Sequence, residues 1–216
     1  MLAALRGGGC TGLRRLSTPL GGLDGGFLAR TSLTAEQVQQ LAATCPRLTH
    51  AACIVRCSVL DATTAATALP GPLFLDCYCQ GDNAGLTQLA DYLRVNASLT
   101  SLDLYGNNIG DEGATQLAEC LRGNATLTSL ELGSNEIHAA GATQLTECLR
   151  VNATLTSLGL SNNGIDDAGA TQLAGSLHVN ATLTCLDLRR NCIRDTGALR
   201  AACPPHCTLL IELLLM

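Results

Sequence analysis

The residues best suited to chemistry in this sequence are its cysteines and histidines, which are common zinc ligands and common nucleophiles and bases. Twelve cysteines are present, and two groups stand close enough in the sequence to suggest a metal site. These groups are Cys53, Cys57, Cys77 and Cys79, and Cys203, His206 and Cys207. Neither has the paired Cys-x-x-Cys spacing that is typical of zinc sites. We therefore expect no metal site.

Nucleophilic catalysis needs a base beside the nucleophile and a third group that orients the base. The histidines His50, His138, His178 and His206 are spread over the chain, with no such third group in evidence. All thirteen basic residues are arginines, which excludes a Schiff-base lysine and the lysine of a phosphate-binding loop. The glycine-rich stretch 21–26 also lacks the spacing of such a loop. We expect no catalytic residues, no enzymatic activity and no cofactor.

Composition also restricts the partners. The formal net charge of −5 disfavours nucleic acid, and no apolar run reaches the ~18 residues of a membrane span. Residues 1–20 lack the continuous apolar segment of a secretory signal, which favours a cytoplasmic protein with reduced, mostly buried cysteines. The same residues contain three arginines and no acid, so a mitochondrial location is the alternative.

A repeat of 28 residues forms the framework that must position any functional side chain. Each block opens with the pattern Leu-x-x-Leu-x-Leu-x-x-Asn-x-Ile, and four blocks begin at Leu99, Leu127, Leu155 and Leu183. The central Leu-x-Leu alternates with polar or small residues, which predicts a short strand with one buried face. The Asn that follows is expected to satisfy backbone groups where the chain turns inward.

The second half of each block predicts a helix. Apolar residues recur there at helical spacing, as in Ala114, Leu117, Ala118 and Leu121. Cys120 and Cys148 lie beside this apolar stripe and are expected to be core residues. Gly123 and Asn124 suit a left-handed helix stop.

A second asparagine in each block begins an Asn-Ala-Ser/Thr triplet, which in a secreted protein would accept a glycan. Its regular recurrence favours a capping role instead. These residues are Asn96, Asn124, Asn152 and Asn180.

The repeated leucines, asparagines and isoleucines, with the Gly-Ala-Thr-Gln-Leu helix starts, resemble the ribonuclease-inhibitor-like subfamily of leucine-rich repeats, which also occurs in NOD-like receptors. The resemblance covers residues 99–208, and extends to 73–98 with a strand half that departs from register by about one residue. It implies an α/β, right-handed leucine-rich-repeat solenoid, with a parallel sheet on the concave side and helices on the convex side.

We divide the chain into a flexible N-terminal segment (1–32), a degenerate cap or decayed repeat (33–72) and a leucine-rich-repeat array (73–216). In the tail, Ile211, Leu214 and Met216 fall one period after Leu183, Leu186 and Leu188, so the chain stops in the middle of a unit. An open apolar edge favours association, and we expect self-association through it unless the sequence is a fragment.

If this fold holds, the outward strand positions line the concave face in columns. Variation between blocks is concentrated in the third column (Tyr105, Gly133, Ser161 and Arg189) and its flanking residues, while the leucines stay fixed. This contrast leaves the columns free for recognition; the alternative is a merely solvated face. Tyr105, Arg189 and Arg190 are of the types that commonly anchor a partner. The predicted contact residues are Ser101, Asp103, Tyr105, Ser129, Glu131, Ser157, Ser161, Asp187, Arg189 and Arg190.

The sequence therefore predicts a protein-binding module, a scaffold or regulatory surface like the ligand-sensing part of NOD-like receptors. The Gly-x-x-x-x-Gly-Lys loop of their nucleotide-binding domain is missing here. One alternative is a ribonuclease-inhibitor-like enzyme inhibitor that binds a basic target through its acidic column. Another is a structural role in assembly through the C-terminal edge.

Overall fold

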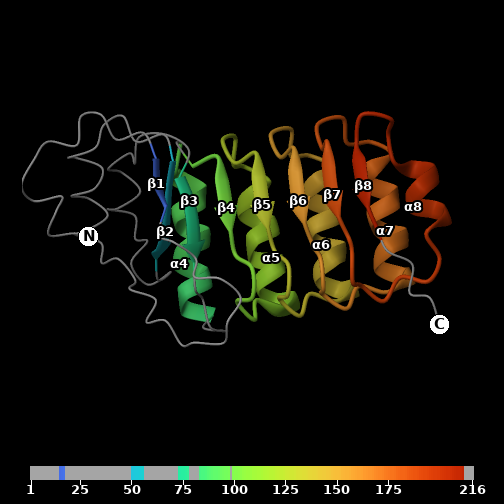
Figure 1. Cartoon of the computed structure of the whole chain (residues 1–216), viewed down its shortest axis with the longest axis horizontal. Helices are drawn as coiled ribbons and strands as arrows, with labels where there is room; N and C mark the ends of the chain where they lie inside the picture. Colours follow the sequence, from blue (N-terminus) through green and yellow to red (C-terminus); the bar gives the residue numbers. More distant parts are fainter. Residues whose placement is uncertain (1–14, 18–49, 56–72, 78–82, 98, 212–216) are drawn as a thin grey trace, which may run out of the picture.

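The computed structural model describes residues 15–17, 50–55, 73–77, 83–97 and 99–211. These form one parallel sheet with helices behind it (Figure 1). The strands follow one another in chain order: β1 (Arg15–Ser17), β2 (His50–Val55), β3 (Leu73–Cys77), β4 (Ser101–Asp103), β5 (Ser129–Glu131), β6 (Ser157–Gly159), β7 (Cys185–Asp187) and β8 (Thr208–Leu210). The helices are α4 (Asn83–Val95), α5 (Gly110–Leu121), α6 (Ala139–Leu149), α7 (Asp167–Leu177) and α8 (Gly197–Ala202). This confirms the predicted fold class, an α/β solenoid.

The strand register follows the leucine repeat. Leu102 pairs with Leu130, Leu130 with Leu158, and Leu158 with Leu186, each one block apart. Strands lie ~4.8 Å apart, whereas packed helices need ~8–10 Å. A coil that contributes one strand and one helix must therefore curve, with the sheet on its inner side.

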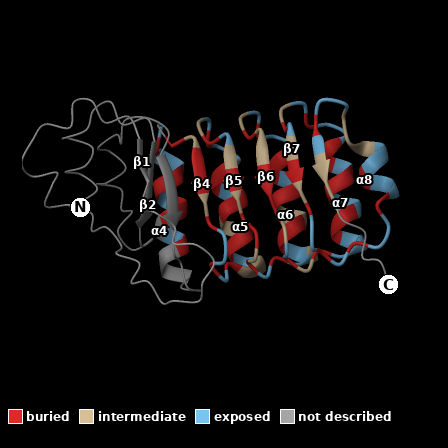
Figure 2. Ribbon diagram, in the orientation of Figure 1, coloured by how far each residue is buried: buried red, intermediate tan, exposed pale blue. Residues whose placement is uncertain are grey.

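The core lies between the sheet and the helices (Figure 2). Both strand-associated leucines of each block are buried, as are Ala114, Leu117, Ala118 and Leu121 on α5. Burying a leucine contributes about 1.5–3 kcal/mol, and the repeat supplies several in each coil. The equivalent residues of successive blocks therefore form one continuous core.

The asparagines that follow the strands, here called the strand-side asparagines, connect successive coils. They are Asn107, Asn135, Asn163 and Asn191. Asn135 is buried; its Oδ1 accepts the Asn107 N–H at 2.8 Å, and its Nδ2 donates to the Leu104 carbonyl, also at 2.8 Å. Asn163 makes both contacts one coil further on, and Asn191 makes them in the coil after that. The predicted structural role is confirmed.

The helix-side asparagines (Asn96, Asn124, Asn152 and Asn180) cap by another route than expected. Asn124 Oδ1 accepts the N–H of Leu127 at 2.8 Å, and Nδ2 donates to the carbonyl of Leu93 in the preceding coil at 2.8 Å. Neither Gly123 nor Asn124 has a positive φ among the residues that the structure describes, so the predicted left-handed stop is wrong. The side chain bonds across the coil, and the backbone needs no left-handed turn.

The last coil is shorter than the repeat. Leu209 pairs with Leu186, only 23 residues away, so the expectation that Leu214 would lie one period after Leu186, with Ile211 and Met216 in the matching places, is wrong. Helix α8 has six residues where α7 has eleven, because Pro204 and Pro205 follow it and proline cannot continue a helix. The strand therefore begins five residues early.

At the other end, Leu75 pairs with Leu102, 27 residues away, which confirms the one-residue departure from register. Strand β2 lies within the predicted cap. Strand β1 lies within the predicted N-terminal segment 1–32 and pairs with β2; the other residues of 1–32 lie outside the described residues. No helix in the described part of the chain is both long and apolar enough to cross a membrane.

Candidate functional site

The open face of the sheet, which points away from the helices, carries the predicted contact residues in three columns. The first column is Ser101, Ser129, Ser157 and Cys185; the second is Asp103, Glu131, Gly159 and Asp187; the third, just beyond the strands, is Tyr105, Gly133, Ser161 and Arg189. Exposure differs along this face: Ser101 is 9% exposed, whereas Tyr105 is 54% exposed. The second and third columns therefore offer most of the accessible side-chain surface.

Each acid of the second column is held by the backbone two residues further on. Asp103 accepts the N–H of Tyr105 at 3.0 Å, and Glu131 accepts the N–H of Gly133 at 2.8 Å. Asp187 accepts the N–H of Arg189 at 3.0 Å. Glycine at position 159 interrupts this pattern, so among β4 to β7 the column has carboxylates on β4, β5 and β7. On β3, Asp76 is the register neighbour of Asp103.

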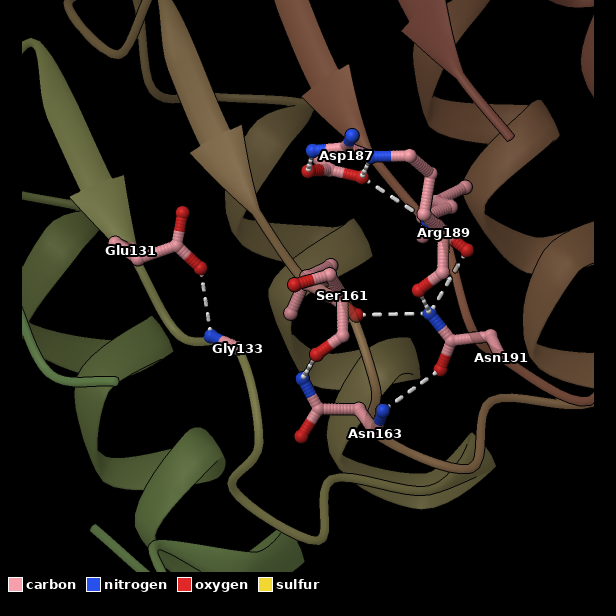
Figure 3. Close-up of polar contacts among 9 residues, drawn as sticks. Glu131, Gly133, Ser161, Asn163, Asp187, Arg189 and Asn191 are labelled. Carbon is pink, nitrogen blue, oxygen red and sulfur yellow. Dashed lines mark hydrogen bonds and ion pairs between the residues drawn. The ribbon is translucent and has the colours of Figure 1, made fainter. Parts of the chain in front are cut away.

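Asp187 and Arg189 neutralise one another. Arg189 donates from Nε to Oδ1 at 2.9 Å and from Nη2 to Oδ2 at 2.6 Å, as Figure 3 shows. The hydrogen bond and charge of this guanidinium lower the pKa of Asp187. Neither Asp103 nor Glu131 has an ion-pair partner among the described residues. Among β4 to β7, the uncompensated negative charge of this column therefore lies on β4 and β5.

The two glycines of these columns provide space for neighbouring side chains. A Cβ at Gly159 would clash with the Glu131 carboxylate, which therefore extends over β6. A Cβ at Gly133 would lie 2.8 Å from Glu131 Oε1, from Ser161 Oγ and from Tyr105 Cδ2. Tyr105, Glu131 and Ser161 therefore meet above Gly133. Sequence reasoning missed this role, although glycine in a column of larger residues was a visible signal.

Burial raises the pKa of the Glu131 carboxyl, and the charges of Asp103 and Asp187 raise it further. The Gly133 N–H and the charge of Arg189 act in the opposite direction without cancelling these effects. The folded protein thus holds a carboxylate where ionisation is disfavoured.

We expect Glu131→Gln to raise the free energy of unfolding at neutral pH, because it removes this disfavoured charge while an amide oxygen can still accept the Gly133 N–H. The folded state has the higher pKa and takes up its proton first as the pH falls. The gain in stability should therefore be fully present at pH values above the pKa of Glu131 in the folded state. It should shrink as the pH falls toward 4.5, the ordinary pKa of a glutamate. Urea denaturation of both proteins across pH 4–8 measures it, and a gain that grows on acidification would contradict it.

Beyond the third column, the backbone of each coil makes a left-handed turn. Gly106, Ser134, Asn162 and Arg190 all have φ between 53° and 69°. Asn162 Nδ2 donates to Ser134 Oγ at 2.9 Å. Arg190 is exposed and has no ion-pair partner in the described part of the chain. The predicted contact residue Arg190 therefore lies at the rim of the open face, whereas Arg189 is already engaged.

Two helix cysteines of the array, Cys120 and Cys148, are core residues, whereas Cys192 is exposed. Cys120 and Cys148 are 2% and 1% exposed, and burial raises the pKa of their thiols to about 12 and about 11. Ser176 takes the equivalent position on α7 and is also buried. These thiols are therefore poor nucleophiles at neutral pH.

Neither proposed cysteine group shows metal-site geometry in the described segments. No cluster of three or more potential ligands is found among the described residues. Cys203 Sγ lies 3.2 Å from the Cys207 carbonyl oxygen, and burial is the main cause that raises the Cys207 pKa to about 12. Of the other group, Cys57 and Cys79 lie outside the described residues.

Comparison with known proteins gave one family and one shared fold. A family model described as "Leucine Rich repeat" matches residues 95–118, 123–145, 151–174 and 179–199. Among solved structures, "Leiomodin-1 Actin-Binding Site 2 (ABS2)" is similar with a TM-score of 0.53 and 23% sequence identity, covering 78% of this chain and 82% of that one. No curated protein matches.

Proposed function

Residues 95–199 are an array of leucine-rich repeats, and on this premise we propose that the chain is a protein-binding module that acts through its open face. The observation that carries the proposal is the contrast between the two sides of the strands. The inward leucines are the same and fully buried in all four repeats, whereas the second and third outward columns change from block to block. Packing of the core explains the first set and does not fix the second.

The proposed contact residues are those of the three columns and their rim, and they differ in availability. Tyr105 and Arg190 are exposed, Glu131 and Asp103 are half-buried acids, and Ser129, Ser157 and Ser161 provide small polar surface. Arg189 and Asp187 act as a pair. Among the described side chains of β4 to β7, this surface has one exposed aromatic ring, Tyr105, which supports a modest affinity.

In this proposal the module has a scaffold or regulatory role, without enzymatic activity, and belongs to the ribonuclease-inhibitor-like subfamily. The cytoplasm is the proposed location, which is supported by the buried free thiols Cys120 and Cys148. Assembly through the C-terminal edge is a second proposal, favoured by Leu209, Leu210 and Ile211, which are only half-buried at the last described strand.

The test compares matched arginine substitutions on the two sides of the same repeats. Ser157→Arg with Ser161→Arg blocks the open face at β6, and Gln144→Arg with Gln172→Arg adds the same charge on α6 and α7. We expect the first pair to abolish capture of partner proteins from native lysate and the second to leave it unchanged.

Purified actin belongs among the defined probes, because the similar leiomodin-1 segment is an actin-binding site. Capture that survives the open-face pair but is lost when residues 208–211 are replaced by polar residues would favour binding through the edge.

A further inference from the structure

We propose that Tyr105, Glu131 and Asp103 form a binding site for an arginine side chain of a partner protein. This inference rests on the proposed function, because it names the chemistry of the partner that the open face receives. It concerns the β4–β5 end of the face, where the aromatic ring and the unpaired acids lie together.

The ring and the carboxylate are neighbours. Tyr105 Cδ2 and Glu131 Oε1 each lie 2.8 Å from the position that a Gly133 Cβ would occupy. The two groups are therefore at most about twice that distance apart, so one guanidinium has room to contact both the ring and the carboxylate. Tyr105 is 54% exposed and is accessible to a partner.

The acids retain acceptor capacity for an incoming donor. Glu131 Oε1 is used by the Gly133 N–H, while no donor among the described residues contacts Oε2. Oε2 lies over Gly159, which has no side chain of its own. Asp103 is the register neighbour of Glu131, and its Oδ1 holds only the Tyr105 N–H.

The charge pattern selects a cation. Asp187, the third acid of the column, is already paired with Arg189, so a partner's positive group is drawn to β4 and β5. After burial, the charges of Asp103 and Asp187 are further causes that raise the pKa of Glu131, and a cation bound there would offset these charges. An acidic partner segment would be repelled.

Arginine fits this arrangement better than lysine. Its planar guanidinium stacks on an aromatic face and presents paired N–H donors to a carboxylate, whereas lysine offers a compact, strongly hydrated charge. Tyr105 provides the face and Glu131 the carboxylate beside it. A site made only of acids would not distinguish the two.

The test uses fluorescein-labelled nonapeptides in which three positions, separated by glycine and serine, are arginine, lysine or the neutral isostere citrulline. Fluorescence anisotropy with the full chain should show tighter binding of the arginine peptide than of either other peptide. We expect Glu131→Gln and Tyr105→Leu each to weaken it roughly three- to tenfold, and Tyr105→Phe to preserve it. Glu119→Gln and Glu147→Gln, which make the same charge change on exposed sites of α5 and α6, should have less than a twofold effect.

Equal binding of the citrulline peptide, no measurable binding of the arginine peptide, or equal losses in the helix variants would overturn the arginine site. Circular dichroism of each variant checks folding, and Glu131→Gln is expected to be at least as stable as the parent at neutral pH. If the paired substitutions at Ser157 and Ser161 abolish lysate capture while the peptides show no preference for arginine, the arginine site fails and the proposed function stands. If the peptides behave as expected while capture ignores the open face, the proposed function fails and the arginine site stands.

Discussion

Asn163→Ala is expected to lower the free energy of unfolding by roughly 3–5 kcal/mol, because it leaves several buried backbone groups without partners. Asn163 Oδ1 accepts the N–H groups of Asn135 and Ile137 at 2.9 and 3.1 Å. Its Nδ2 donates to the carbonyls of Leu132 and Ser161 at 2.8 and 3.2 Å. Alanine replaces none of these bonds, and the side chain is only 2% exposed, so water cannot substitute readily.

Urea denaturation followed by circular dichroism measures the loss, and Asn162→Gly provides the matched control. Asn162 is the adjacent asparagine, is exposed and has a φ of 53°, where glycine is at least as comfortable as asparagine. The control loses one exposed hydrogen bond to Ser134 and should change stability by less than about 1 kcal/mol. Similar losses in both variants would show that the asparagine row does not join the coils.

The strand-side asparagines join neighbouring coils of the array. Each repeat touches only its neighbours, so the stability of a solenoid depends on the interface terms between repeats. Asn163 bonds backbone groups of the preceding coil, while Asn191 bonds those of the coil that contains Asn163. Loss of one asparagine should therefore uncouple two neighbouring coils, and the denaturation transition should broaden as well as shift.

The repeat could be predicted from the sequence because its determinants are local. A Leu-x-Leu pattern specifies a strand with one buried face, and the spacing from Leu102 to Leu186 specifies equivalent positions in successive coils. The last coil differed because its length depends on where α8 ends, and Pro204 and Pro205 set that end. The prediction continued the 28-residue period past those prolines, and so placed the final strand five residues late.

The candidate site was only partly predictable, because its geometry depends on contacts between neighbouring strands. Alternation along a strand identifies which side chains point outward, so the columns could be assigned. It contains no information on how a long side chain leans across to the next strand. The Asp187–Arg189 pair and the position of Glu131 over Gly159 depend on these lateral contacts, and both change which charges a partner would meet.

Gly141→Ala is the second substitution with a large expected effect, a loss of about 2 kcal/mol from overpacking. A Cβ at Gly141 would lie 2.7 Å from Asp111 Oδ1, 2.9 Å from Ile137 Cγ2 and 3.0 Å from Ala114 Cβ. Asp111 Oδ1 is the acceptor that caps α6, bonding the N–H groups of His138 and Gly141 at 2.8 Å each. The methyl group would displace this cap and separate α6 from α5.

Gly175→Ala is the matched control, since it makes the same change in a helix where space is available. Gly175 lies near the exposed end of α7, and its nearest neighbour, Arg150 Nη2, would be 3.5 Å from the new Cβ, an ordinary contact. There alanine should stabilise the protein by about 0.5–1 kcal/mol, because it restricts the unfolded chain and favours the helix. Thermal unfolding of the two variants should therefore shift in opposite directions. If the unfolding temperatures of both variants rise, helix propensity alone determines the effect of these glycines. The close approach of α5 and α6 then does not require the glycine that begins each Gly-Ala-Thr-Gln-Leu segment.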